Sequence, residues 1–471
     1  MKNVFIGLMM LMNIAAFSQG KKLTLQQCVE TALNNNLLVK QSELTKDRDE
    51  VNWKQAKANM LPNISGSINY GANQGRSIDP FTNSFINQQL NFSNLSANGS
   101  LPLFSGLQVQ NQIKQNNLTF QASKLDWQQA KDNLTLNVIL SYLLELNNED
   151  VLALSNAQVE VTKKQVERLE TLNTEGAIAP YTLTDLKGQL ASDEVAVVNG
   201  ENNVQAAKLT LAQLMNMPYD NAMELERISV EEAMGLYEGT TDKIYEEALQ
   251  KLGLVKAADL RKQGAEKGIK AARANYYPTL SLFGGLGTNY SSAAQLNSVA
   301  SEFYGPTDSY VTVNGTNIPL NVKQQTYKSE PFGFGKQYNN NLNTQFGIAL
   351  QVPIANNFRA RNQVALAKIN YKNTQLIADN TRIQLRQNIE QAHQNMTASY
   401  NRYKILTQQV TAFEESFRSA EIRFNNGVIN SVEYLQVKNN LDRAKVNLTQ
   451  AKYEYVLRTK VLDFYQGKLT W

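Results

Sequence analysis

The sequence predicts an α+β membrane protein that is exported from the cytoplasm and built from two copies of one structural unit. Three observations support this prediction. The chain begins with a secretory signal, a set of motifs recurs in its two halves, and two stretches of about 69 residues each read as one long helix. Short segments of alternating polar and apolar residues precede each long helix. We therefore expect each copy to contribute strands and a long helical hairpin.

The N-terminal segment has the features of a signal peptide. Lys2 is followed by an apolar run from Val4 to Phe17, with small residues before a cleavage site after about Ser18. This run is shorter than the roughly 20 residues of a transmembrane helix. No later segment is apolar enough to be one, because even 134–146 contains four polar residues. We expect 1–18 to be removed and the mature chain to be periplasmic, secreted or part of an outer-membrane β-barrel.

Composition excludes several classes of function. The 46 Lys and Arg residues nearly balance the 42 Asp and Glu residues and are interspersed with them, so no basic stripe indicates a nucleic-acid partner. Cys28 is the only cysteine, which rules out an intramolecular disulfide and a multi-thiolate metal site. Its surroundings resemble the start of a helix, and this favours a small buried residue over lipid attachment.

Motifs recur between the two halves of the chain. Residues 30–33 (ETAL) match 246–249 (EEAL), which follow 216 positions later. Residues 101–103 (LPL) match 352–354 (VPI), now 251 positions later. We therefore expect a first repeat at 19–236 and a second at 237–471, with about 35 extra residues in the second copy. Those residues fall in a long polar loop at 291–340.

Four segments alternate with period two and are predicted strands. Each has one apolar face and one face of Ser, Asn, Gln and Gly without charge. A half-buried sheet in a soluble domain shows the same alternation, but the uncharged polar faces suit a water-filled lumen. Four strands cannot close around a lumen, so we expect at least a dimer or trimer. The predicted strands are 63–73, 91–103, 279–290 and 341–354.

The long helices are too long for a compact domain. Residues 105–174 and 356–426 would each span on the order of 100 Å at ~1.5 Å per residue. Apolar residues recur every three or four positions, as in coiled coils. Gly176 and Gly427 are expected to end these helices as C-terminal caps, with return helices following. The other predicted helices are 24–60, 178–216, 241–275 and 430–465.

The ordered motifs resemble the TolC-like outer-membrane efflux protein family. The resemblance rests on the segment 23–29, on Leu61-Pro62 and Tyr277-Pro278 before strands, on 101–104 and 352–354 after strands, and on the two glycine turns. It implies a homotrimer in which each chain gives four strands to a twelve-strand β-barrel in outer-membrane lipid. The barrel would continue into a long periplasmic α-helical barrel, which meets a periplasmic adaptor (membrane fusion) protein and an inner-membrane transporter.

The function implied is that of a passive exit duct in a tripartite efflux or type I secretion system. Such a duct is not an enzyme and needs no cofactor and no metal. The sequence offers no catalytic constellation, and its one histidine, His393, reads as a helix-surface residue. The alternative is a periplasmic coiled-coil scaffold or adaptor-like interaction protein without a pore.

The resemblance also indicates a gate at the periplasmic tip. Glu433, six residues past Gly427, matches an acidic position of the family, while Gln436 replaces a second acid and Ile429 a basic residue. In the first copy, Asp185 lies nine residues past Gly176 and Thr182 lies six past it. Asp185 and Glu433 could form rings of negative charge in the trimer, or be ordinary exposed acids near helix N-termini.

The glycine turns place apolar residues at tips that we expect to be exposed. These residues are Ala177, Ile178, Val428 and Ile429. The resemblance suggests that the adaptor docks on them, although their role could be limited to reversing the chain. The extra loop at 291–340 is expected outside the cell, because outer-membrane barrels have their longer loops there.

Overall fold

The computed structural model describes residues 22–78, 83–87, 89–229 and 235–468. The predicted signal peptide at 1–18 lies outside them. The chain forms two compact units, and each takes segments from both halves of the sequence. The helical unit comprises Met1–Asn52, Gln115–Glu266 and Ile369–Trp471, and the sheet unit comprises Trp53–Lys114 and Lys267–Lys368.

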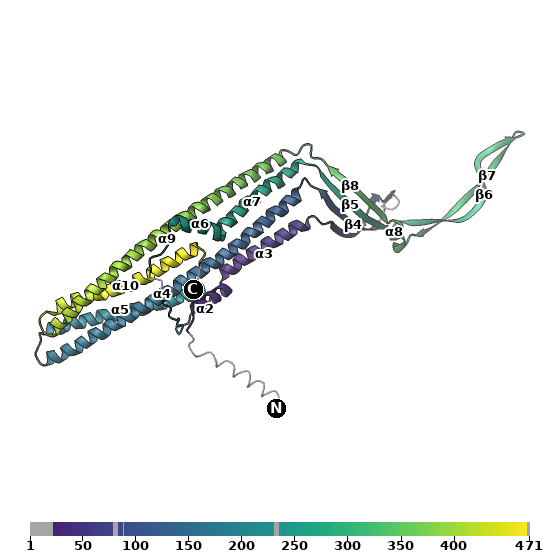
Figure 1. Ribbon diagram of the computed structural model, residues 1–471. Helices are drawn as coiled ribbons and strands as arrows, with labels where there is room; N and C mark the ends of the chain where they lie inside the picture. Colours follow the sequence, from purple (N-terminus) through teal and green to yellow (C-terminus); the bar gives the residue numbers. More distant parts are fainter. Residues whose placement is uncertain (1–21, 79–82, 88, 230–234, 469–471) are drawn as a thin grey trace, which may run out of the picture. The chain divides into compact units, whose positions relative to one another are not determined.

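Helices make up most of the described chain (Figure 1). Two helices of 67 residues, α4 and α9, each return into a helix of 35 residues, α5 and α10. Within the described parts of the chain, none of the helices combines the length and apolar character needed to cross a membrane. The helices are α2 (Leu25–Asn35), α3 (Leu37–Ala58), α4 (Gln108–Thr174), α5 (Pro180–Leu214), α6 (Thr241–Lys251), α7 (Gly253–Arg273), α8 (Phe334–Asn340), α9 (Arg359–Asn425) and α10 (Ser431–Tyr465), with a 3-10 turn at Ala274–Tyr276.

Each of the single helices predicted at 24–60 and 241–275 is in fact interrupted. Asn36 has an extended backbone, and its side-chain Oδ1 accepts a hydrogen bond from the Leu38 N–H at 2.9 Å. Its Nδ2 donates to the Leu214 carbonyl at 3.1 Å, so the interruption is tied to the end of α5. Leu252, which stands 216 residues later, separates α6 from α7 with the same extended backbone. The sequence pattern hides these breaks because apolar spacing continues across them.

Three apolar clusters hold the helical unit together. The first surrounds Tyr142 of α4, whose hydroxyl donates to the Leu23 carbonyl at 3.1 Å, and it includes Cys28, which is fully buried. The second joins α6, α7, α9 and α10 around Tyr455. The third joins the α4–α5 and α9–α10 hairpins at their turns, around Tyr434. Each buried Leu, Ile, Val or Phe in such clusters contributes roughly 1.5–3 kcal/mol of hydrophobic stabilisation.

Both glycine turns form the same hydrogen-bonded cap. Gly176 and Gly427 have φ angles of +72° and +71°, which an L side chain rarely adopts. The N–H of Ala177 donates to the Leu172 carbonyl, and the N–H of Val428 donates to the Arg423 carbonyl, both at 2.8 Å. These are the six-to-one bonds of a Schellman motif, so both glycines act as the C-terminal caps that the sequence predicts.

The sheet unit contains a four-stranded antiparallel sheet in the order β1-β4-β5-β8. β1 and β4 are joined within the first half and β5 and β8 within the second, while β4 pairs with β5 across the halves. Strand β8 is shorter than the predicted 341–354, because the backbone leaves the sheet before Pro353. The four strands are β1 (Asn63–Asn73), β4 (Leu90–Phe104), β5 (Thr279–Ser291) and β8 (Asn343–Gln351).

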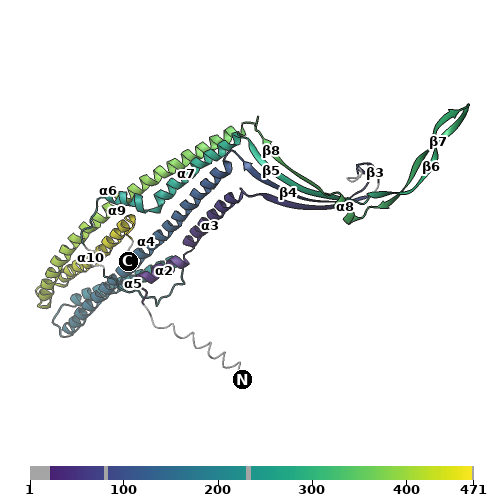
Figure 2. The same cartoon turned by 45° about the vertical axis from the view of Figure 1, so that its right-hand side comes forward.

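The residues predicted as a long polar loop at 291–340 are mostly strand. β6 (Gln295–Val313) and β7 (Thr316–Pro331) form an antiparallel ribbon that leaves the end of β5 (Figures 1 and 2). Asn314 and Gly315, with φ angles of +50° and +83°, make its two-residue turn. The Asn-Gly pair is a typical hairpin turn signal, but the polar composition of the segment around it favours a loop. A smaller ribbon pairs β2 (Arg76–Ile78) with β3 (Phe85–Asn87).

Candidate functional site

The two helical turns of the helical unit lie against each other and form one tip. Tyr434 of α10 is fully buried there, and its ring stacks on Phe424 of α9 with centroids 4.4 Å apart. Leu169 of α4 and Leu186 of α5 belong to the same cluster. A groove of about 640 Å³ runs between the turns and is lined by both of them. The tip is therefore a packed junction of two hairpins with a hollow at its surface.

The predicted tip acids are each engaged within the chain. Asp185 accepts a hydrogen bond from the Ser431 hydroxyl at 2.7 Å, which links α5 to the start of α10. Glu433 lies in the first turn of α10, and its carboxylate is 3.6 Å from Arg423 of α9. The Glu433 backbone N–H donates to Asn430 Oδ1 at 2.9 Å, so Asn430 caps the helix. Gln436 is exposed.

The apolar residues of the turns do not all point outward, as the sequence analysis expected. Ala177 and Val428 are exposed, and Val428 keeps 64% of its surface in solvent. Ile429 is only 7% exposed, and Ile178 packs against the same cluster as a half-buried residue. The second apolar residue of each turn is less exposed than the first because it packs into the cluster around Tyr434.

A cross-hairpin contact at the tip was not predicted. Arg168 of α4 donates to the Asn425 carbonyl, at the end of α9, at 2.7 Å, and its other terminal nitrogen contacts the Asn425 side chain. The two residues are 257 positions apart in the sequence. No local pattern relates them, so only the packed hairpins reveal the pair.

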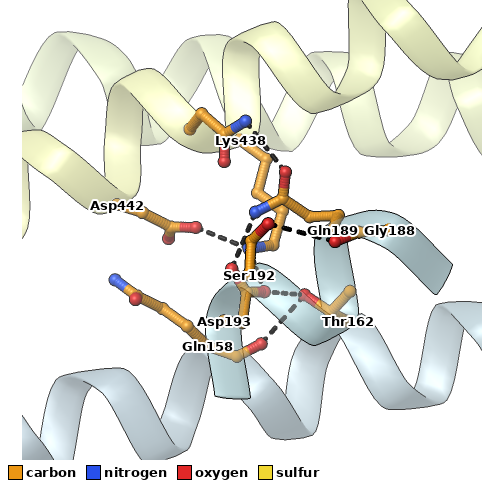
Figure 3. A network of polar contacts seen from close by, with 9 residues as sticks. Gln158, Thr162, Gly188, Gln189, Ser192, Asp193, Lys438 and Asp442 are labelled. Atoms are coloured by element: carbon orange, nitrogen blue, oxygen red, sulfur yellow. Dashed lines mark hydrogen bonds and ion pairs between the residues drawn. The ribbon is translucent and has the colours of Figure 1, made fainter. Parts of the chain in front are cut away.

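A buried polar network lies deeper in the same hairpins (Figure 3). Lys438 of α10 is 2% exposed and donates to Asp193 of α5 at 2.9 Å and to Asp442 at 2.6 Å. Asp193 also accepts from Thr162 of α4 at 2.5 Å and from Gln189 at 2.7 Å. We call these five residues the inter-hairpin network. It joins three helices through one cation and two carboxylates.

The charged members of the inter-hairpin network stabilise the hairpins only as a set. Burial raises the pKa of the Asp442 carboxyl above its ordinary value, while the nearby Lys438 ammonium acts in the opposite direction. A buried charge that loses its partner typically costs 3–5 kcal/mol. Lys438 and Asp442 are four residues apart on one helix, which is a recognisable pair, but Asp193 is 245 residues away from Lys438. The complete network could not be found from spacing.

The sheet unit offers a second candidate surface, because much of both sides of its sheet is exposed in the single chain, away from the end that α8 covers. On one side, Ile64 and Phe346 of the two edge strands are 74% and 90% exposed. On the other side, Ser67, Ser96 and Asn343 lie in one cross-strand row. The Ser67 and Ser96 hydroxyls are 2.8 Å apart. The sheet thus has an apolar face and an uncharged polar face.

The His, Cys, Asp and Glu side chains are dispersed over the described parts of the chain. Among the described residues, no three His, Cys, Asp or Glu side chains are grouped so that they could hold a metal ion. His393 lies on α9, where its Nε2 is 3.2 Å from the Gly239 carbonyl. This contact joins α9 to the segment before α6, which is a structural role.

Comparison with known proteins identifies the family. A family model described as "Outer membrane efflux protein" matches residues 28–217 and 244–467, which is most of the chain. The chain belongs to this family. As an outer membrane efflux protein it is located in the outer membrane, with its helical part in the periplasm.

The chain is also similar to individual outer-membrane proteins. Outer membrane protein TolC of Escherichia coli (strain K12) is 21% identical over 337 residues, which are 70% of this chain and 60% of TolC. The chain therefore matches somewhat less than two thirds of that relative's length. The CusC structure has a TM-score of 0.76 at 13% identity, covering 96% of this chain and 95% of CusC. The VceC structure from Vibrio cholerae has a TM-score of 0.75 at 16% identity, covering 94% and 96%. These likenesses show a shared fold.

Proposed function

We propose that the chain forms a homotrimeric exit duct across the outer membrane. Three copies would supply twelve strands to one β-barrel, and their helices would form a periplasmic barrel. The duct would carry solutes or proteins passively. A periplasmic adaptor protein and an inner-membrane transporter, which supplies the energy, would complete a tripartite efflux or type I secretion system.

The open four-stranded sheet is the observation that carries this proposal. Its apolar face suits lipid and its uncharged polar face suits a water-filled lumen. Its outer strands, β1 and β8, have no further strand partner in the sheet as described. Unpaired strand edges are not tolerated in lipid, so copies of the chain must pair edge to edge. In a soluble scaffold, a Phe346 side chain that is 90% exposed would leave apolar surface in water, which soluble proteins avoid.

The tip supports the gating and docking parts of the proposal. Asp185 and Glu433 would ring the periplasmic entrance and favour cations there. The contact of Asp185 with Ser431 would hold the two hairpins together when the duct is closed, and that of Glu433 with Arg423 would brace the α9–α10 hairpin. Ala177 and Val428, the exposed residues of the two turns, would be the contact points for the adaptor. Ile178 and Ile429 would support them from inside.

Proline substitution in β8 tests the edge pairing. Consecutive N–H groups of an edge strand point to opposite sides, so one of Gln345 and Phe346 donates toward β5 and the other points away from the sheet. Proline removes the N–H, and free edges tolerate it. If β8 pairs with another copy, both Gln345→Pro and Phe346→Pro reduce the heat-sensitive trimer recovered from outer membranes.

The matched controls are Gln345→Ala and Phe346→Ala, which keep the N–H groups and should leave the trimer assembled. A wild-type protein that is a soluble monomer would contradict the proposal. So would one proline variant that assembles as well as its alanine control, because that result would mean that the edge is free.

A further inference from the structure

The β6–β7 ribbon has an apolar face that the family assignment does not explain. Alternate residues of the two strands share one side of the ribbon, and the outer half of that side contains six apolar residues without a charge. Each is between 44% and 52% exposed. We call these six residues the ribbon face: Phe303, Val311, Val313, Ile318, Leu320 and Val322.

The opposite side of the ribbon is different in chemistry. It contains Tyr304 across from Lys323, and Glu302 across from Gln325. Lys323 Nζ and the Glu302 carboxylate are 2.5 Å apart. The ribbon is therefore amphipathic, with one side suited to water. A two-stranded ribbon is marginally stable alone and needs its apolar side covered.

The base of the ribbon is fixed to the sheet. Gln337 of α8 is fully buried, accepts from the Ser291 N–H at 2.9 Å, and donates to the Ser291 carbonyl at 2.9 Å. The Phe332 N–H donates to the Ala294 carbonyl at 3.0 Å, which closes the two strands at their base. The Ser292 N–H donates to the Asn91 carbonyl of β4 at 2.9 Å. The ribbon thus continues the sheet.

Because the ribbon continues the sheet, the partner of the ribbon face is expected to be the ribbon of a second copy of the chain. Copies that pair along β1 and β8 bring one ribbon each to the same end of the barrel, so the ribbon of a second copy is always nearby. The ribbon face carries no charge, so identical faces can meet without repulsion. The two charged residues on the same side, Lys328 and Glu330, lie nearer the base and pair with each other at 2.7 Å.

We propose that the ribbon faces of the copies in one oligomer pack against one another and form a closed cluster at the outer end of the barrel. The inference rests on the proposed function, because it needs an oligomer joined through the sheet edges. In this cluster, burial of the six apolar side chains of each copy stabilises the ribbons, and the Tyr304 side faces the medium. The partner is a second copy of this chain and not lipid or a foreign protein.

Cysteine crosslinking on the assembled protein tests the packing. In a Cys28→Ala background, Leu320→Cys places a thiol on the ribbon face, and Asn321→Cys places one on the opposite side at the next position. A short bifunctional maleimide should join Leu320→Cys chains into covalent dimers, at most two of the three chains of a trimer because each chain has one thiol, and should leave most Asn321→Cys chains monomeric after heating. Adding Ile318→Asp should abolish the Leu320→Cys crosslinks because like charges then meet, whereas Asn317→Asp on the opposite side should not.

The outcomes separate this inference from the proposed function. Mass measurement of the uncrosslinked protein shows whether an oligomer exists, and a monomer there would contradict both. An intact oligomer in which Leu320→Cys and Asn321→Cys crosslink equally, or in which neither crosslinks, would overturn the ribbon packing alone. Quenching of a label at Leu320→Cys by nitroxide-bearing lipid would also overturn it, since the face would then rest on the membrane.

Discussion

Glu145 carries a buried carboxyl group in the helical unit, and its ionisation should make stability depend on pH. Its side chain is fully buried on α4, and both carboxylate oxygens lie without a hydrogen-bond partner among the described atoms. The nearest cation, Lys208 Nζ, is 3.9 Å from Oε1. Burial, and next the neighbouring Glu149 charge, raise the pKa of Glu145 from 4.5 to about 8. The folded protein therefore holds this carboxyl in its neutral form at pH 7.

The raised pKa of Glu145 makes the folded protein less stable as the pH increases. The folded state binds the proton more tightly than the unfolded state, so the stabilising effect of protonation is complete below pH 4.5. It is lost as the pH rises to about 8. At pH 7 the cost relative to a neutral side chain is at most about 3.5 kcal/mol, because each pKa unit between 4.5 and 7 corresponds to about 1.4 kcal/mol. The isosteric Glu145→Gln variant removes this cost.

Thermal unfolding of the detergent-solubilised protein, followed by circular dichroism between pH 5 and pH 8, measures the effect. With an unfolding entropy of about 2.1 cal/mol/K per residue, about 3.5 kcal/mol corresponds to a Tm difference of about 3.5 °C in a chain of this length. Glu145→Gln should equal the wild type near pH 5 and exceed it increasingly toward pH 8. Parallel pH profiles for the two proteins would refute the reasoning.

Two further substitutions test the hairpin junction and the turns. Lys438→Met should lower the free energy of unfolding by about 3–5 kcal/mol, because it leaves the buried Asp193 and the half-buried Asp442 without the Lys438 cation. Its counterpart Lys187→Met, at a solvent-exposed pair with Glu170, should lower it by less than about 1 kcal/mol, and equal effects in denaturant titrations would contradict the burial argument. Gly427→Ala should cost about 1–2 kcal/mol from its positive φ alone, since the added Cβ meets nothing within 4 Å. Gly188→Ala, inside α5 and equally open, should instead stabilise by up to about 1 kcal/mol, and a stabilised Gly427→Ala would show that the turn is not held as described.

Much of the fold follows from local sequence patterns. Alternation places a strand at 63–73, where the structure has β1 at Asn63–Asn73. The absence of proline, and of any glycine other than Gly106, predicts a helix at 105–174, where α4 spans Gln108–Thr174. Both signals are local. Alternating polarity marks a strand within consecutive residues, and an uninterrupted run without helix breakers marks a helix. Boundaries were displaced where the chain uses side chains as caps, as Asn36 does.

The parts that sequence reasoning missed depend on contacts between distant residues. The network around Lys438 needs α5 and α10 to lie together, and the two helices are separated by more than two hundred residues. The burial of Ile429 follows from the packing of two hairpins around Tyr434. The β6–β7 ribbon was missed for a different reason. Its strands are polar on one side and its apolar side is uncovered, so composition resembled that of a loop.

Planar-bilayer conductance of the purified mature protein tests the central claim most directly. A duct lined by the polar face of the sheet and by Asp185 and Glu433 at its tip predicts discrete, cation-selective current steps. An Asp185→Asn, Glu433→Gln variant of unchanged oligomeric state should keep the steps and lose part of the cation selectivity. The absence of steps from an intact wild-type oligomer would contradict the account and favour a pore-free scaffold.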